Sequence, residues 1–331
     1  MCPTKHKPSL KSPSDSDGES SYDWRQEVID GGSLRRVDLH DGSNGWASPP
    51  GDLFSLRGLD YFSRRKKIPS GNWLLLPAGV DWLRSPHRLD NVLGRPDNRV
   101  SAALRRAQSL GKFLKSFVFA VNLQVPGHDC HSAVFYFATD DPIPTGSLLH
   151  RFIHGDDAFR NSRFKIVNRI VKGPWIVKAA VGNYSACLLG KALVCNYHKG
   201  ENYLEIDVDI GSSAIASAIL KLALGFVTAV TIDMGFVIEA QAEDELPEKL
   251  IGAVRIAQME MSAAAYVEPA KGRVGATATS AIEQRRGGPV RIEQERDEEA
   301  EVSRKQILSN FNEHCCYSID PNNGNSGLWS S

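Results

Sequence analysis

An alternating run near the middle of the chain constrains the fold more than any other feature. From Tyr203 to Ile210 the sequence reads YLEIDVDI, so apolar residues alternate with Glu205, Asp207 and Asp209. Successive side chains of a β-strand point to opposite faces, so the three carboxylates share one face and the apolar residues face the core. We predict that cross-strand Arg or Lys residues pair with these acids. Binding of a hard cation is the alternative, but the ligand spacing of a calcium loop is absent.

The segments around this strand predict further short elements joined by loops that contain glycine. A predicted helix, 147–159, carries apolar residues on one side and is expected to break near Gly155. Short strands with tight connections favour antiparallel pairing, because parallel pairing needs long crossovers. We therefore predict an α+β fold with a mainly antiparallel sheet and packed helices. The other predicted elements are strands at 117–125, 132–139, 165–171, 175–181 and 192–197, and a helix at 100–114.

Residues 212–240 form the longest apolar segment, interrupted by Lys221 and Asp233. Its length is compatible with a membrane span, but both charges are costly in the middle of a bilayer. We therefore predict no transmembrane span. The favoured interpretation is a helix at 214–224 followed by a strand at 226–238, and one long helix is the alternative.

Composition changes along the chain predict one domain between two tails. Residues 1–45 and 267–331 are rich in small, polar and charged residues, so we expect both segments to be disordered. Residues 46–266 contain every strong strand candidate and no linker, and we expect them to form one domain. The sequence begins Met-Cys-Pro, which excludes N-myristoylation and leaves acylation of Cys2 open.

Charge and cysteine usage limit the partners and the compartment. The formal net charge is zero, so we expect no nucleic-acid binding by the molecule as a whole. Six scattered Cys and no signal-peptide pattern favour a reducing cytoplasmic setting, with peripheral membrane attachment as a further possibility. Local basic clusters are the candidates for binding an anionic lipid or membrane surface. They comprise Arg64, Arg65, Lys66 and Lys67, and then Arg160, Arg163 and Lys165.

No residue pattern in the chain predicts catalysis. We find no nucleophile elbow, no phosphate loop and no Ser/His/Asp or Cys/His grouping. The loop 127–131 reads GHDCH, but three ligand types in so short a loop cannot easily surround one tetrahedral ion. We therefore expect a protein without catalytic residues, metal or cofactor.

Several longer segments resemble one protein family in the family's own order. They are FSLRGLDYFSRRKKIPSG (54–71), FAVNLQVP (119–126), LLHRFIHGDDAFRNSRFKIV (148–167), KGPWIVKAAVG (172–182), LLGKAL (188–193), NYLEIDVDIGSS (202–213) and ELPEKLIGAVR (245–255). Through them, residues 46–266 resemble the C-terminal domain of the plant enhanced disease resistance 2 family. The resemblance implies a role in restraining defence and cell death, and implies no catalytic mechanism. Longer members also carry a phosphoinositide-binding domain and a START-type lipid-binding domain, and nothing in this sequence resembles either.

Two functional hypotheses follow from these observations. The first is a non-enzymatic regulatory domain that binds lipid or an anionic membrane through the two basic clusters. The second is a protein-interaction scaffold without a lipid ligand, in which the charges are structural.

Overall fold

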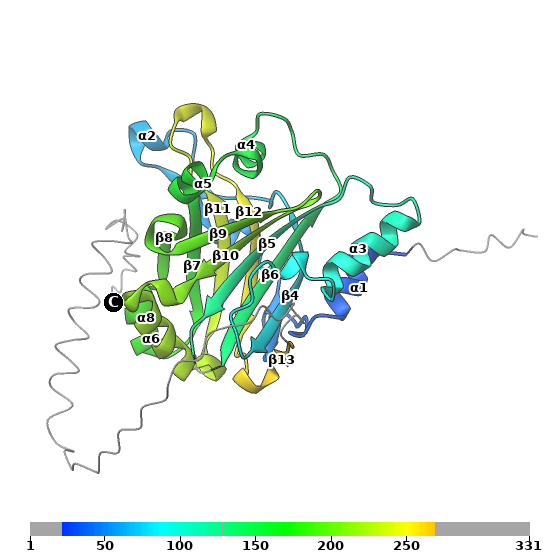
Figure 1. Cartoon of the computed structure of the whole chain (residues 1–331). Helices are drawn as coiled ribbons and strands as arrows, with labels where there is room; N and C mark the ends of the chain where they lie inside the picture. Colours follow the sequence, from blue (N-terminus) through cyan, green and yellow to red (C-terminus); the bar gives the residue numbers. More distant parts are fainter. Residues whose placement is uncertain (1–21, 128, 269–331) are drawn as a thin grey trace, which may run out of the picture.

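The structure, a computed structural model, describes residues 22–127 and 129–268. Within these ranges, two large sheets and one hairpin are accompanied by eight α-helices (Figure 1). The five-stranded sheet has the order β1 (Gly45–Ala47), β12 (Leu250–Ala257), β11 (Thr231–Ile238), β7 (Phe164–Lys172), β8 (Tyr184–Leu188). The six-stranded sheet has the order β13 (Ala265–Tyr266), β4 (Leu76–Ser85), β6 (Cys130–Thr139), β5 (Phe117–Val125), β10 (Tyr203–Asp209), β9 (Val194–Lys199). The hairpin joins β2 (Ser55–Arg57) to β3 (Lys67–Pro69).

The helices lie at the ends and on the outer faces of the sheets. The α-helices are α1 (Trp24–Asp30), α2 (Tyr61–Arg64), α3 (Arg99–Ser109), α4 (Leu148–His154), α5 (Asp157–Arg163), α6 (Trp175–Val181), α7 (Leu189–Ala192) and α8 (Ala214–Gly225). Single 3-10 turns are η1 (Gly51–Leu53), η2 (Val92–Gly94), η3 (Ile210–Ser212), η4 (Val227–Ala229), η5 (Glu243–Glu245) and η6 (Met261–Ala263). None of the helices in the described ranges is long and apolar enough to cross a membrane.

The prediction of an α+β fold with mainly antiparallel pairing is confirmed. All pairs of the five-stranded sheet are antiparallel, and the six-stranded sheet has two parallel pairs, β5 with β10 and β4 with β13. The β5–β10 pair is parallel because the chain between β6 and β10 first builds two strands of the other sheet. This long excursion is the crossover that parallel pairing requires.

The main core lies between the two sheets and is rich in aromatic rings. Phe236 of β11 packs against Phe135 and Phe137 of β6, each with a ring-centroid distance of 5.8 Å. On its opposite face, the six-stranded sheet is covered by α1 and α3, which lie side by side in Figure 1. Neighbouring residues of β5 point into different cores, since Phe119 belongs to the main core and Val118 to the helix-covered one. This alternation is the period of two that the strand geometry imposes.

The N-terminal boundary differs from the prediction. Residues 22–45 were expected to be disordered, yet Trp24, Val28 and Leu34 are at most 2% exposed. Trp24 and Val28 lie four residues apart on α1 and so face the same side, and the side chain of Asp23 caps the helix by accepting from the N–H of Arg25. The predicted tails at 1–21 and 269–331, with Cys2, lie outside the described residues, as does His128.

One predicted strand is a helix. Residues 175–181 were predicted to be a strand from their β-branched and aromatic content, but they form α6. Pro174, with φ −58°, is the residue just before the helix, where its missing N–H interrupts no helical hydrogen bond. Val177 and Ala180 are the buried residues and lie three apart on one helical face. Tertiary burial therefore outweighs the β-propensity of this segment.

The favoured interpretation of the long apolar segment is confirmed, with a later strand start. Helix α8 is followed by η4, and β11 begins at Thr231 and not at residue 226. Predicted helix 147–159 breaks at Gly155 into α4 and α5, as expected. On β11, the fully buried Asp233 lies opposite Arg169 of β7 and Arg255 of β12. Both guanidinium groups bind its carboxylate, at 2.7 Å and 2.5 Å, and so fix the register of three strands.

The acidic strand β10 has the predicted faces but mostly different partners. Its apolar residues belong to the main core, as expected. Only Asp209 pairs with a cation of the predicted kind, Arg88, at 2.9 Å. The prediction of Arg or Lys partners is wrong for Glu205 and Asp207, which are fully buried.

Backbone amides and polar side chains bind the two buried acids of β10. Glu205 accepts the N–H groups of Val92 and Leu93 at 2.6 and 2.7 Å. Asp207 accepts from the Asn91 N–H and from the Asn122 side chain, both at 2.9 Å. These contacts attach the η2 segment to the outer face of β10, so the buried acids of this face have a structural role.

Candidate functional site

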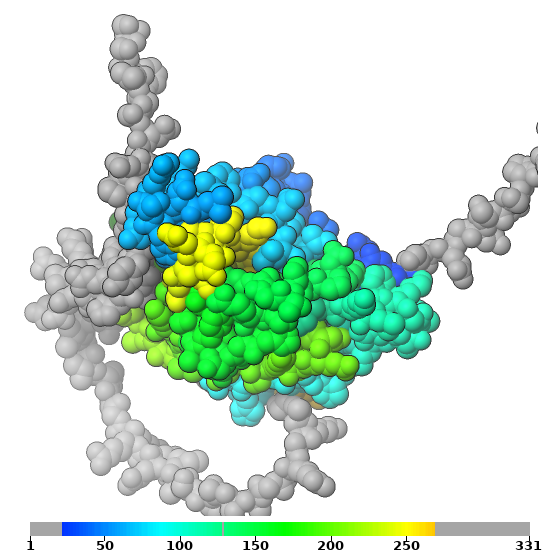
Figure 2. All heavy atoms as spheres, turned by 90° about the horizontal axis from the view of Figure 1, so that it is seen from above, coloured from blue at the N-terminus to red at the C-terminus, as the bar shows by residue number. Residues whose placement is uncertain are grey.

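The basic run lies on a projecting turn at one end of the molecule. Its position follows from the β2–β3 hairpin, in which Arg57 is opposite Lys67. Helix α2 fills the connection and ends at Arg64, and the next residue, Arg65, has a left-handed backbone with φ 53° and reverses the chain. In Figure 2 the segment that contains this turn projects beside the segments around η5 and α5.

The side chains of the turn combine exposed cations with an apolar residue. Arg64, Arg65 and Lys66 are exposed, whereas Lys67 is half-buried at the start of β3. Arg64 has one carboxylate nearby, Asp60 at 3.8 Å, and this pair is exposed. Leu59, just before the helix, is 69% exposed. A leucine this accessible next to cations gives the turn both charge and an apolar contact.

Tyr61 anchors the turn to the body of the domain. Its ring is 3% exposed and has Arg57 and Arg65 over it, with guanidinium carbons 4.7 and 5.6 Å from the ring centroid. Cation–π contacts of this kind hold a guanidinium without neutralising its charge. Arg65 therefore keeps its charge available to a ligand.

A pocket of about 120 Å³ opens beside the turn. Its charged lining consists of the cations Arg57, Lys67, Lys165 and Lys191 and the acids Glu239 and Glu248. Arg57 and Lys165 both contact the two glutamates, at distances from 2.7 to 3.6 Å. Within the described ranges, Lys67 and Lys191 have no carboxylate partner at salt-bridge distance. The pocket therefore has an excess of positive charge, carried by these two lysines.

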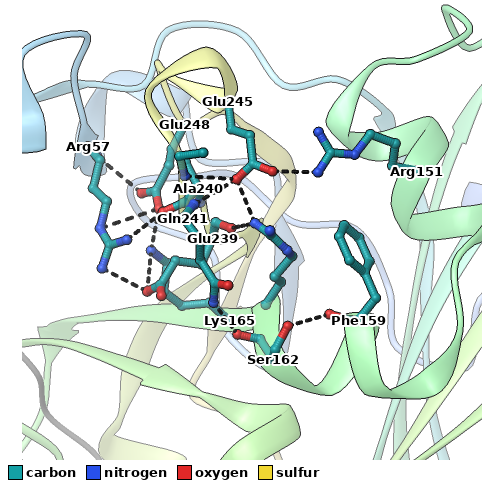
Figure 3. A network of polar contacts seen from close by, with 12 residues as sticks. Arg57, Arg151, Phe159, Ser162, Lys165, Glu239, Ala240, Gln241, Glu245 and Glu248 are labelled. Atoms are coloured by element: carbon teal, nitrogen blue, oxygen red, sulfur yellow. Dashed lines mark hydrogen bonds and ion pairs between the residues drawn. The ribbon is translucent and has the colours of Figure 1, made fainter.

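Behind the pocket, three buried glutamates bind four cations, of which Arg151 is partly exposed (Figure 3). Arg163 binds Glu245 at 2.6 Å, and Arg151 binds the other oxygen of the same carboxylate, also at 2.6 Å. Burial alone would raise the pKa of Glu245, but the Gln241 N–H and the two arginines hold it below its usual value. Lys165 Nζ lies 2.7 Å from Glu248 Oε1 and 3.3 Å from Glu239 Oε2. The network joins the end of β11 and the start of β12 to α5 and β7.

The structure brings together some of the residues predicted from the sequence and separates others. Lys67 of the first basic cluster and Lys165 of the second line the same pocket. Arg160 donates to the carbonyl oxygens of Phe152 and Ile153, at 3.0 and 2.9 Å, and so joins α5 to α4. Arg163 is held by Glu245 and by the Glu239 carbonyl oxygen. Ligand binding by Arg160 and Arg163 stays a prediction.

Sequence reasoning missed four residues of this site. Arg57, Leu59 and Tyr61 stand close to the basic run in the chain, and Lys191 is far from it. The sequence held one local signal: Leu59 lies between Gly58 and Asp60, and both neighbours are typical of turns, where a leucine is expected to be exposed. Lys191 joins the site only through the packing of α7 against α5 and β7.

The fold and the site together define a class of protein. The protein has a two-sheet α+β domain with a basic, partly apolar turn, and no group of three or more His, Cys, Asp or Glu in the described part of the chain could hold a metal. The family model described as "Protein ENHANCED DISEASE RESISTANCE 2, C-terminal" matches residues 46–260, and the chain belongs to this family.

A relative in Arabidopsis thaliana has a similar sequence. The protein described as "Protein ENHANCED DISEASE RESISTANCE 2-like" is 43% identical over 233 residues. The matched region is 70% of this chain and 31% of the relative, so the chain spans less than a third of that protein's length. The family resemblance inferred from the sequence segments is therefore confirmed.

Proposed function

We propose that this domain is a non-enzymatic regulatory module that binds an anionic membrane surface through its basic turn. By its family, its setting would be the regulation of plant defence and cell death. One observation carries the proposal: Arg64, Arg65 and Lys66 are exposed on one projecting turn that also exposes Leu59. Lys67 and Lys191 in the adjoining pocket add charge suited to a phosphate group.

The magnitudes favour a membrane over a small soluble anion as the partner. Each Lys or Arg close to an anionic membrane surface is worth about 1 kcal/mol. Burying one leucine side chain adds about 1.5–3 kcal/mol. A soluble anion in the pocket would gain from the lysines but not from Leu59. The turn therefore gains most from a surface that is both anionic and apolar below its headgroups.

Vesicle flotation with the full chain tests this proposal. We expect the protein to float with vesicles that contain phosphatidylserine and to stay behind with vesicles of phosphatidylcholine alone. Raising the salt from about 0.1 M to about 1 M shortens the screening length from about 10 to about 3 Å and should release the protein. The scaffold hypothesis predicts no flotation with either vesicle, and that result would overturn the proposal.

A further inference from the structure

A second cavity, of about 160 Å³, lies at the other end of the sheets and is almost wholly apolar. Asp81 is the one charged or polar residue among the 21 that line it. The carboxylate of Asp81 is already bound, because it accepts from the Ser33 N–H at 2.9 Å and from Arg99 at 2.9–3.1 Å. An apolar cavity of roughly 150 Å³ in another protein stays free of water and binds benzene. This cavity is therefore suited to an apolar group of similar size.

Helices α6 and α8 cover this cavity and form what we call the lid, together with η4. Val177, Leu220, Leu224 and Val227 of the lid line the cavity. No residue of α8 is buried, although its sequence, AIASAILKLALG, is apolar except for two positions. Segments with few buried contacts open locally at low cost. The lid can therefore move aside for a ligand longer than the cavity itself.

The outer side of the lid is apolar and positively charged. Trp175 at the start of α6 is 79% exposed, and Phe226 at the end of α8 is 38% exposed. The lid elements contain Lys178 and Lys221 and no acidic residue. A ligand with an apolar chain in the cavity would therefore place its other end among cations.

We infer that this cavity binds the chain of a single-chain anionic amphiphile, a fatty acid in the simplest case. The apolar lining takes the end of the chain, and the lysines of the lid favour a negatively charged headgroup. The site is separate from the pocket beside the basic turn. Lys165 of β7 lines that pocket and Ile170 of the same strand lines the apolar cavity, and five residues of strand span roughly 16 Å. The inference does not depend on membrane binding by the turn.

Fluorescence of cis-parinaric acid, with displacement by oleic acid, tests this site in the full chain. Ala223 of α8 lines the cavity, whereas Ala214 at the start of the same helix is exposed. We expect Ala223→Leu to fill part of the space. Leucine has three more carbons than alanine, and each methylene-sized group of ligand that it keeps out of the site lowers affinity about fourfold, so we expect Ala223→Leu to bind about sixtyfold more weakly than the parent. Ala214→Leu should bind as the parent does.

Three results would overturn the inference. They are no fluorescence increase with the parent, unchanged binding by Ala223→Leu, and equal weakening in Ala214→Leu. If Ala223→Leu does not fold, Ala133→Leu on β6 fills the cavity from the opposite wall and decides the question.

Two further experiments test the charge of the headgroup and distinguish the two binding sites. Oleyl alcohol should displace the probe less well than oleic acid, and Lys178→Gln with Lys221→Gln should remove that difference. Equal displacement by both in the parent would overturn the anionic headgroup. Ala223→Leu should still float with anionic vesicles, and removal of the basic turn should leave probe binding unchanged, so failure at one site is distinguishable from failure at the other.

Discussion

Replacing Lys165 by Met tests whether this lysine is structural or available to a ligand. The side chain of Lys165 is 8% exposed, and that of its partner Glu248 is 1% exposed. Methionine keeps much of the apolar stem and removes the charge, so Glu248 and Glu239 lose the ammonium that lies between them. Arg57 still binds Glu239 at 3.0 Å, but its Nε lies 3.6 Å from Glu248, farther than the 2.7 Å contact that Glu248 loses.

The expected loss is large because the carboxylate of Glu248, which loses its close cation, is buried. Removing one partner of a buried ion pair costs about 3–5 kcal/mol. For a domain of this size, each kcal/mol lowers Tm by about 2–4 °C, so we expect Lys165→Met to melt at least 6 °C lower. Urea unfolding of the parent and the variant gives the free energy directly. Lys191→Met is the matched control, because Lys191 lines the same pocket, is exposed and should change stability by at most about 0.5 kcal/mol.

A double-mutant cycle then assigns the loss to the pair. Lys165→Met with Glu248→Gln should lose less than the sum of the two single changes, by about 0.5–3 kcal/mol. A loss under about 1 kcal/mol for Lys165→Met alone would refute the reasoning. Lys165 would then be free to serve the ligand, as the sequence suggested.

Two further predictions concern pH and surface charge. Burial and the neighbouring Asp207 raise the pKa of Glu205 to about 9, so between pH 4.5 and that value the folded state holds a proton that the unfolded state has lost. The free energy of unfolding should therefore fall as pH rises from about 5 to 9, by at most about 1.4 kcal/mol per pH unit. Urea unfolding across this range should show this slope. In the Glu205→Gln variant the slope should be flatter. Glu243 and Asp244 of η5 are exposed, and the segment that contains η5 lies beside α2 in Figure 1. Glu243→Gln with Asp244→Asn should therefore strengthen flotation with anionic vesicles, and weaker flotation would place the membrane on another face.

Local sequence patterns predicted the elements whose stability is decided locally. The alternation in β10 placed its apolar side chains in the core, and Gly155 marked the break between α4 and α5. The partners of Glu205 could not be predicted, because they are N–H groups of residues 92 and 93, more than a hundred positions away. Helix α6 was mispredicted for the same reason: burial of Val177 and Ala180 against distant residues decides its structure.

The candidate site was also predicted only in part. Four consecutive cations are visible in any reading of the chain, and the structure exposes three of them. Nothing in the sequence shows that Lys67 and Lys165 share a pocket or that Glu239 and Glu248 compensate Lys165. These contacts depend on how the hairpin docks beside β7 and β11, and charge alone cannot distinguish a buried ion pair from a free cation.

Flotation of two matched quadruple variants tests the central claim most directly. The first changes Arg64, Arg65, Lys66 and Lys67 to Gln, and the second changes Arg105, Arg106, Lys112 and Lys115, near the far end of α3, to Gln. Both remove four positive charges, so any difference reports position and not net charge. At about 1 kcal/mol per charge, the first variant should lose roughly a thousandfold in partitioning to anionic vesicles while the second floats like the parent. Equal flotation of the two variants would contradict the account.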